Sequence, residues 1–125
     1  MVGLTDDEWR WEPIADDRVS LRWRLGHITA LLTEDRTGPW LGLPLSRFTA
    51  AEPGSAADVL TTLDEAYAAW RAKLAATTEE SLAEPIGDVA GPYGTDSRYA
   101  FALHIVDELI HHSAEAALLR DLYPG

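Results

Sequence analysis

The chain has 125 residues, a formal net charge of −11 and no cysteine. Its length predicts one domain, spanning residues 1–125. The negative charge disfavours binding to nucleic acid phosphates and to anionic membranes, and no basic stripe offsets it. Without cysteine, disulfides and thiolate ligands are excluded, so any metal site must use histidine and carboxylate side chains.

The N-terminal residues have neither the basic start nor the apolar stretch of a signal peptide. No apolar run of about 18 residues indicates a transmembrane helix. We therefore expect a cytoplasmic protein. The apolar fraction of 46% is typical of a globular chain and not of a disordered one.

Three long helices are predicted from the helical spacing of apolar residues, and no strand alternation is visible, so the expected fold class is all-α. The first helix covers Val19–Glu34, and its apolar residues form stripes on two sides. Asp16 and Asp17 precede it as candidate N-caps. A helix that is buried on two sides is typical of a bundle.

The second helix is predicted to begin near Ser55, because Ser55 and Asp58 resemble a capping box. The third helix runs from about Ser97 to Asp121. The connecting segments Thr37–Pro53 and Gly87–Asp96 are rich in glycine, proline and hydroxyl residues, and are predicted to be loops.

A weak internal repeat relates Thr5–Ile14 to Thr77–Ile86. Each copy resembles a short capped helix followed by Glu-Pro. The second copy follows a long helix, whereas no long helix precedes the first, so the repeat suggests a missing first helix. The alternative is that Glu-Pro turns are common and that the likeness is accidental.

A carboxylate and an imidazole lie on the predicted core face of the third helix. Glu108 and His112 are four residues apart, so they stack on one face. Buried groups of this kind must be paired or bind a metal, and the spacing suits two ligands of one ion. His27, the one histidine outside the third helix, is the candidate third ligand. The alternative is a buried ion pair of Glu108 and His112 without a metal.

Glu115 and His104 lie at the edge of the same face, whereas His111 lies near the polar flank of the helix. His104 is a candidate fourth ligand, although it is one turn further away. His104, His111 and Glu115 are also candidates for supporting residues that contact the ligands and not the ion. The five tryptophans are interpreted as packing residues.

Several motifs resemble the DinB-like metal-dependent helical-bundle superfamily. Trp23-Arg24-Leu25-Gly26-His27 is similar to its W-x-L-G-H signature, and Glu108–Glu115 is similar to its last-helix motif. Leu4–Pro13 resembles the segment between its first two helices. The resemblance covers Leu4–Tyr123. It implies an up-down-down-up four-helix bundle with three metal ligands, of which this chain lacks most of the first helix.

The superfamily includes DinB-type proteins and the N-terminal domain of mycothiol-dependent maleylpyruvate isomerase. Many DinB-type members have histidine at the position of Glu108, whereas the isomerase branch resembles this chain in its His, Glu, His set. The resemblance thus implies that His27, Glu108 and His112 are the ligands. Zinc is the first choice of divalent ion, with nickel, iron or manganese as alternatives. The implied cofactor is mycothiol or another low-molecular-weight thiol, acting on a small-molecule electrophile.

Three functions therefore remain open. The first is a thiol-dependent transferase or isomerase, or a hydrolase, that uses a metal-activated thiol or water. The second is a non-catalytic module that binds a metal or dimerises, and the third is a purely structural domain. We also expect a homodimer, because one neighbouring helix cannot cover both apolar sides of Val19–Glu34. The competing interpretation is that Met1–Pro13 folds back and covers this surface with Trp9 and Trp11.

Overall fold

The computed structural model describes residues 1–125, and its regular structure is helical apart from one isolated β-bridge. The three predicted long helices are present as α2 (Leu21–Thr33), α3 (Ala56–Ala75) and α5 (Arg98–Leu122). The short elements are α1 (Asp6–Arg10), η1 (Asp35–Thr37), η2 (Pro39–Leu41), α4 (Glu79–Ala83) and η3 (Asp88–Tyr93). The all-α class is thus confirmed. None of these helices combines the length and the hydropathy that a bilayer span requires.

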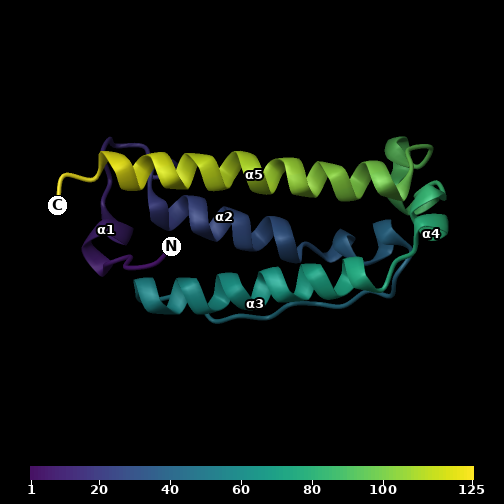
Figure 1. Ribbon diagram of the computed structural model, residues 1–125, viewed down its shortest axis with the longest axis horizontal. Helices are drawn as coiled ribbons and strands as arrows, with labels where there is room; N and C mark the ends of the chain where they lie inside the picture. The colour runs from purple at the N-terminus through teal and green to yellow at the C-terminus, as the bar shows by residue number, and fades with distance from the viewer.

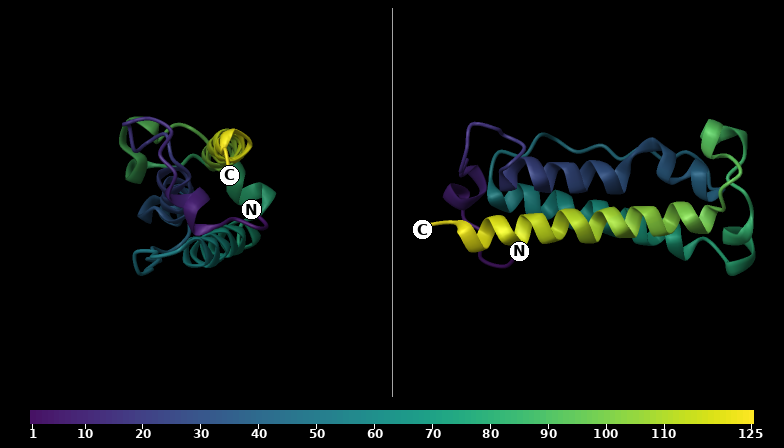
Figure 2. Two further views of the ribbon diagram at one scale, coloured as in Figure 1. Left: turned by 90° about the vertical axis from the view of Figure 1, so that its left-hand side faces the viewer. Right: turned by 90° about the horizontal axis from the view of Figure 1, so that it is seen from above.

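The long helices form an open bundle with α2 in the middle. Helices α2 and α3 run in the same direction, because residues 42–55 return along the length of the bundle before α3 begins (Figure 1). Helix α5 runs antiparallel to both. Helix α2 packs against α3 and against α5, as the two further views also show (Figure 2). This arrangement is the down-down-up part of the order that the family resemblance implies.

Helix α2 begins at a cap different from the one predicted. The hydroxyl of Ser20 accepts a hydrogen bond from the backbone N–H of Trp23 at 3.1 Å. The prediction of Asp16 and Asp17 as caps is wrong. The Asp16 carboxylate instead pairs with Arg18 at 2.7 Å, and the Asp17 carbonyl accepts the Ser20 hydroxyl. Ser20 lies closer to the first helical turn, so its oxygen reaches the free N–H groups.

Helix α3 begins at Ser55, as the sequence predicted. The Ser55 hydroxyl accepts from the backbone N–H of Asp58 at 3.1 Å. The Asp58 carboxylate accepts from the N–H of Gly54 and not from that of Ser55, so the motif is only half of a capping box. The two repeat copies do form short helices, with Thr5 and Thr78 as their N-caps.

The core is drawn mainly from the three long helices. Helix α2 is covered by α3 on one side and by α5 on the other, which explains its two apolar stripes. The largest fully buried apolar side chains are Trp9, Leu21, Leu25, Leu32, Leu41, Trp70 and Ile105.

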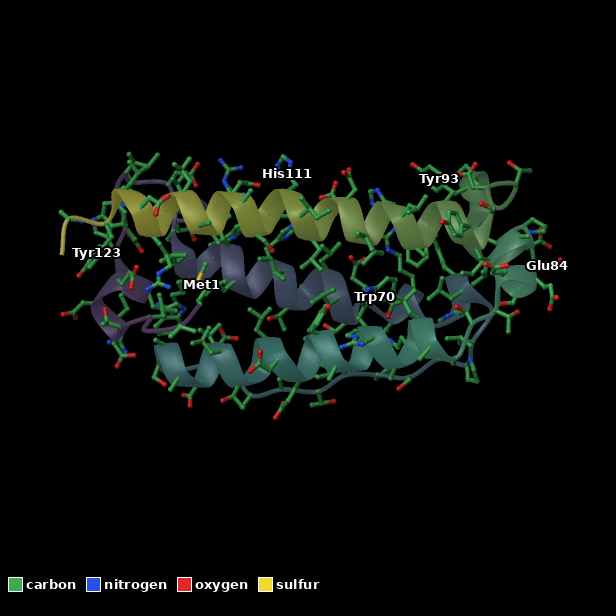
Figure 3. The ribbon with its side chains drawn as sticks, in the orientation of Figure 1. Met1, Trp70, Glu84, Tyr93, His111 and Tyr123 are labelled. Carbon is green, nitrogen blue, oxygen red and sulfur yellow. The ribbon has the colours of Figure 1, made fainter.

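The N-terminal segment folds back over one end of the bundle. Helix α1 packs against α2 and α3, and Trp9 is only 1% exposed. Trp11 lies instead beside Tyr123, with ring centroids 5.5 Å apart. Figure 3 shows Met1 and Tyr123 at this end, with Trp70 on α3 further along the bundle.

An apolar groove remains between α3 and α5. Its volume is about 450 Å³, and α2 forms its floor. Its apolar lining residues are Met1, Leu25, Ile28, Leu32, Leu63, Tyr67, Leu109 and Ala116. Three large α5 side chains at helical spacing remain in contact with solvent: Leu103 is 53% exposed, Val106 36% and Ile110 65%.

We expect two copies of the chain to associate through this groove and the exposed apolar side chains of α5, because exposed apolar surface costs about 25 cal/mol per Å². Light scattering at micromolar concentration should then give twice the chain mass of 13.7 kDa. Ile110→Asp should produce the monomer, whereas Val89→Asp, at an exposed site on η3, should not. A wild-type 13.7 kDa species that unfolds cooperatively would contradict the dimer and show that the folded-back N-terminus suffices.

Candidate metal centre

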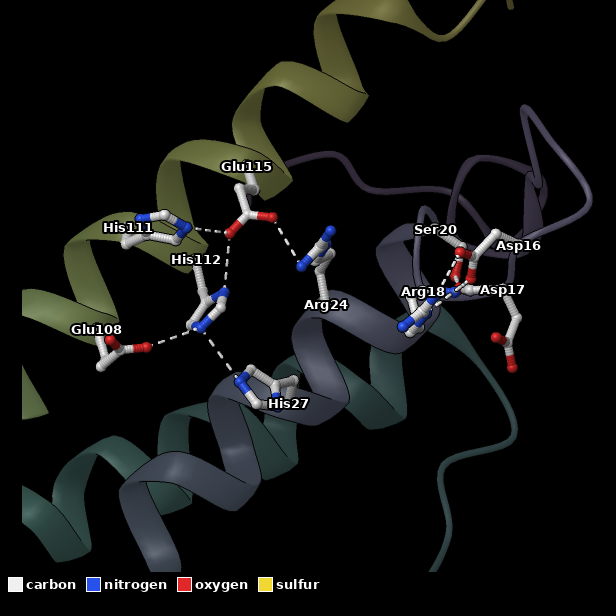
Figure 4. Close-up of polar contacts among 10 residues, drawn as sticks. All are labelled: Asp16, Asp17, Arg18, Ser20, Arg24, His27, Glu108, His111, His112 and Glu115. Carbon is white, nitrogen blue, oxygen red and sulfur yellow. Dashed lines mark hydrogen bonds and ion pairs between the residues drawn. The ribbon is translucent and has the colours of Figure 1, made fainter.

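A cluster of polar side chains lies where α2 and α5 cross, near the middle of both helices (Figure 4). Helix α2 contributes Arg24 and His27, and α5 contributes Glu108, His111, His112 and Glu115. The sequence predicted that the two histidine-bearing helices pack together, and the structure confirms it. This packing brings His27 and His112, which are 85 positions apart in the sequence, into contact.

Two contacts connect the three predicted ligands, and both involve His112 Nε2. His27 Nε2 lies 3.1 Å from His112 Nε2, and Glu108 Oε2 lies 3.1 Å from the same His112 nitrogen. Ligands that hold zinc tetrahedrally at about 2.0–2.1 Å are themselves about 3.3 Å apart. Both separations are therefore close to an edge of such a tetrahedron.

Glu115 determines which nitrogen of His112 carries the proton. Its Oε1 atom lies 2.9 Å from His112 Nδ1 and 2.8 Å from His111 Nε2. A carboxylate only accepts, so His112 donates through Nδ1 and, when neutral, leaves the lone pair of Nε2 free. That lone pair faces the Glu108 carboxylate, and both are acceptors. A cation or an additional proton is needed between them.

Arg24 and Trp23 support the two histidines that are candidate ligands. Arg24 Nη1 lies 2.7 Å from Glu115 Oε2, on the carboxylate that holds His112. The same guanidinium lies 5.1 Å from the Trp23 ring, which stacks on His27 at 4.8 Å with an interplanar angle of 10°. The sequence pattern did not indicate Arg24, and Trp23 was predicted to be a packing residue. The i, i+3 spacing of Arg24 and His27 was a usable signal for Arg24, but nothing in the sequence pairs it with Glu115.

Burial lowers the pKa of His27 below its ordinary value of 6.5, and the neighbouring His112 and Arg24 lower it further. Glu108 and Glu115 oppose this effect only in part. The His27 imidazole is therefore neutral at pH 7, which is the form that can bind a metal.

The lowered pKa predicts that the metal-free protein loses stability in acid. Below about pH 6.5 the unfolded chain binds a proton at His27 that the folded chain does not, so the free energy of unfolding decreases as pH falls. The loss continues until pH reaches the folded-state pKa. Urea unfolding between pH 5 and pH 8 should show a steeper decline for the wild type than for His27→Gln. Equal slopes would contradict this assignment.

A second group of potential ligands lies on α5 alone. His111, His112 and Glu115 have ligand atoms that all lie within 4.8 Å of one another, a limit that the set of His27, Glu108 and His112 does not meet. The His111 side chain is 66% exposed, whereas that of His112 is 11% exposed. Because Glu115 already accepts from His112, lies against His111 and pairs with Arg24, we favour the set that joins two helices. His104 makes no contact with the cluster and instead lines a separate pocket near the start of α5.

The fold and the cluster together define a helical bundle with a histidine and carboxylate cluster between two of its helices. The DinB superfamily model matches residues 1–116, so the chain belongs to the DinB superfamily. No curated protein and no solved structure matches the chain. The function must therefore be argued from the cluster itself.

Proposed function

We propose that this DinB superfamily member binds one divalent metal ion, with zinc as the first choice, through His27, Glu108 and His112. The observation that carries the proposal is the direction of the lone pairs. Glu115 accepts a hydrogen bond from His112 Nδ1, so His112 Nε2 is left facing both His27 Nε2 and the Glu108 carboxylate. A metal ion would pair with all three groups once His27 and Glu108 close on it, whereas a single proton satisfies only one contact.

The donor set also indicates which chemistry the site can support. Two imidazoles and one carboxylate form a three-ligand set of the kind that leaves a position for a further ligand. A zinc ion in such a site lowers the pKa of a thiol or of water, and so supplies a nucleophile at neutral pH. The chain has no cysteine, so a thiol nucleophile must come from a low-molecular-weight cofactor such as mycothiol.

We therefore propose thiol transfer to an electrophile, or a thiol-assisted isomerisation, as the activity. Its test uses zinc-loaded protein, N-acetylcysteine and 1-chloro-2,4-dinitrobenzene. In that reaction the C–S bond forms, the C–Cl bond breaks, and chloride and the thiol proton are released. We expect faster conjugation with the wild type than with His27→Gln. Metal binding without acceleration would instead identify a non-catalytic metal-binding module.

Arg24→Gln is expected to weaken metal binding about 10- to 100-fold, the usual cost of losing a partner that orients a ligand. Arg24 holds the Glu115 carboxylate that orients His112, and it lies over the ring that stacks on His27. Competition with a chromophoric chelator measures the affinity, and the visible spectrum of the cobalt-loaded protein reports ligand geometry. The matched control is Arg22→Gln. Arg22 is also on α2, but its guanidinium lies over Trp9 of α1. Equal losses in both variants would contradict the positioning role.

A further inference from the structure

A second pocket lies beside the first turns of α5. Its volume is about 300 Å³, which is the lower end of the range for small-molecule sites. Its aromatic walls are Trp40, Tyr93 and Phe101, and its polar groups belong to Arg36, Asp96 and His104. Tyr93 is labelled at this end of the molecule in Figure 3. Neither the family match nor the proposed metal site assigns a role to this pocket.

The aromatic rings hold the Arg36 guanidinium in place. It lies 4.9 Å from the centroid of Trp40 and 5.3 Å from that of Phe101, and these two rings are 5.1 Å apart. Cation–π contacts of this kind restrict the guanidinium group while its N–H groups stay able to donate hydrogen bonds in the plane of the group.

The terminal nitrogens of Arg36 have no hydrogen-bond acceptor. Its Nε atom forms an ion pair with Glu34 Oε2 at 2.9 Å, although the angle is not that of a hydrogen bond. The guanidinium forms no hydrogen bond to any other residue. A planar guanidinium group with unpaired N–H groups suits a carboxylate, which can accept two parallel hydrogen bonds from it.

We propose that this pocket binds a planar monocarboxylate, with its carboxylate on Arg36 and its ring against Trp40 and Tyr93. Asp96 in the pocket lining and the net charge of −11 disfavour phosphates and other polyanions. The binding site rests on Arg36 and the aromatic walls alone.

The position of the pocket connects it to the candidate metal centre. His104 precedes Glu108 by four residues, so the two lie on one face of α5 with a rise of about 6 Å between them. A carboxylate compound held on Arg36 is therefore placed on the same face of α5 as the cluster. Its role as a substrate, unlike the binding itself, rests on the proposed function.

Benzoate and benzamide test the inference, because they differ in charge and hardly in shape. Metal-free His27→Gln protein is used, so that benzoate cannot bind through an ion. The signal is the indole N–H of Trp40 in ¹H–¹⁵N spectra, assigned by its loss in Trp40→Phe. We expect a saturable shift with benzoate and at least tenfold weaker binding of benzamide. Arg36→Gln should weaken benzoate binding at least tenfold. Arg47→Gln, at an exposed ion pair with Asp35, should leave it unchanged.

Each other outcome overturns the inference. Equal binding of the two compounds would remove the carboxylate specificity, and this comparison needs no Arg36 variant that might misfold. Unchanged benzoate binding in Arg36→Gln would remove the role of Arg36, and an unshifted Trp40 signal would remove the pocket. Because these measurements use metal-free protein, their failure is distinct from a failure of the metal proposal.

Discussion

His112→Gln is expected to abolish stoichiometric metal binding, the largest functional effect that the structure predicts. His112 is the centre of the cluster, since its Nε2 faces His27 and Glu108 while its Nδ1 bonds to Glu115. Elemental analysis of protein purified without chelator should give about one divalent ion per wild-type chain and almost none in the variant. Metal present at 100 times its dissociation constant stabilises a protein by about 2.7 kcal/mol, so the wild type should also lose thermal stability on chelation.

The adjacent histidine provides the matched control. His111→Gln should retain the metal, because His111 lies beside His112 and Glu115 but is not a ligand in the set that we favour. His27→Gln should lose the metal. The reverse pattern, with metal lost in His111→Gln and kept in His27→Gln, would assign the ion to the group on α5 alone. Wild-type protein without metal would instead favour a plain ion pair.

Arg120→Met is expected to lower the free energy of unfolding by about 3 kcal/mol, the low end of the range for an ion pair broken inside a protein. Arg120 Nε lies 2.8 Å from Glu8 Oε1, and Nη1 donates to the carbonyl of Val2. The Glu8 side chain is only 9% exposed and that of Arg120 is 27% exposed. Removing the guanidinium leaves a buried carboxylate without a partner and frees the N-terminal segment from the end of α5.

Urea unfolding midpoints measure the effect, and a double variant explains it. Glu8→Met combined with Arg120→Met should recover part of the loss, because no unpaired charge remains. Arg18→Met, which removes an exposed ion pair with Asp16, should leave the midpoint unchanged. A stable Arg120→Met protein would show that the pair does not hold the N-terminal segment in place.

The helices were predictable because their signals are local. Apolar spacing located α2, α3 and α5 to within two residues at the ends that were predicted. Ser55 was correctly predicted as the N-cap of α3. The cap of α2 was not predicted, since Asp16, Asp17 and Ser20 all suit the role chemically. Only the path of the chain decides which of the three oxygens reaches the first turn.

The ligand candidates also came from the sequence, because Glu108 and His112 share a helix face by spacing alone and His27 is the one histidine elsewhere. The contacts around these candidate ligands could not be predicted from the sequence. Arg24 reaches Glu115, and His104 faces an aromatic pocket instead of the cluster, because the crossing of α2 and α5 sets these contacts. Periodicity fixes which side of a helix a residue occupies, whereas the distance between residues on two helices depends on how their side chains interlock. The sequence by itself thus determined the helices, the fold class and the candidate ligands. Tertiary packing alone decided which protons, carboxylates and rings surround them.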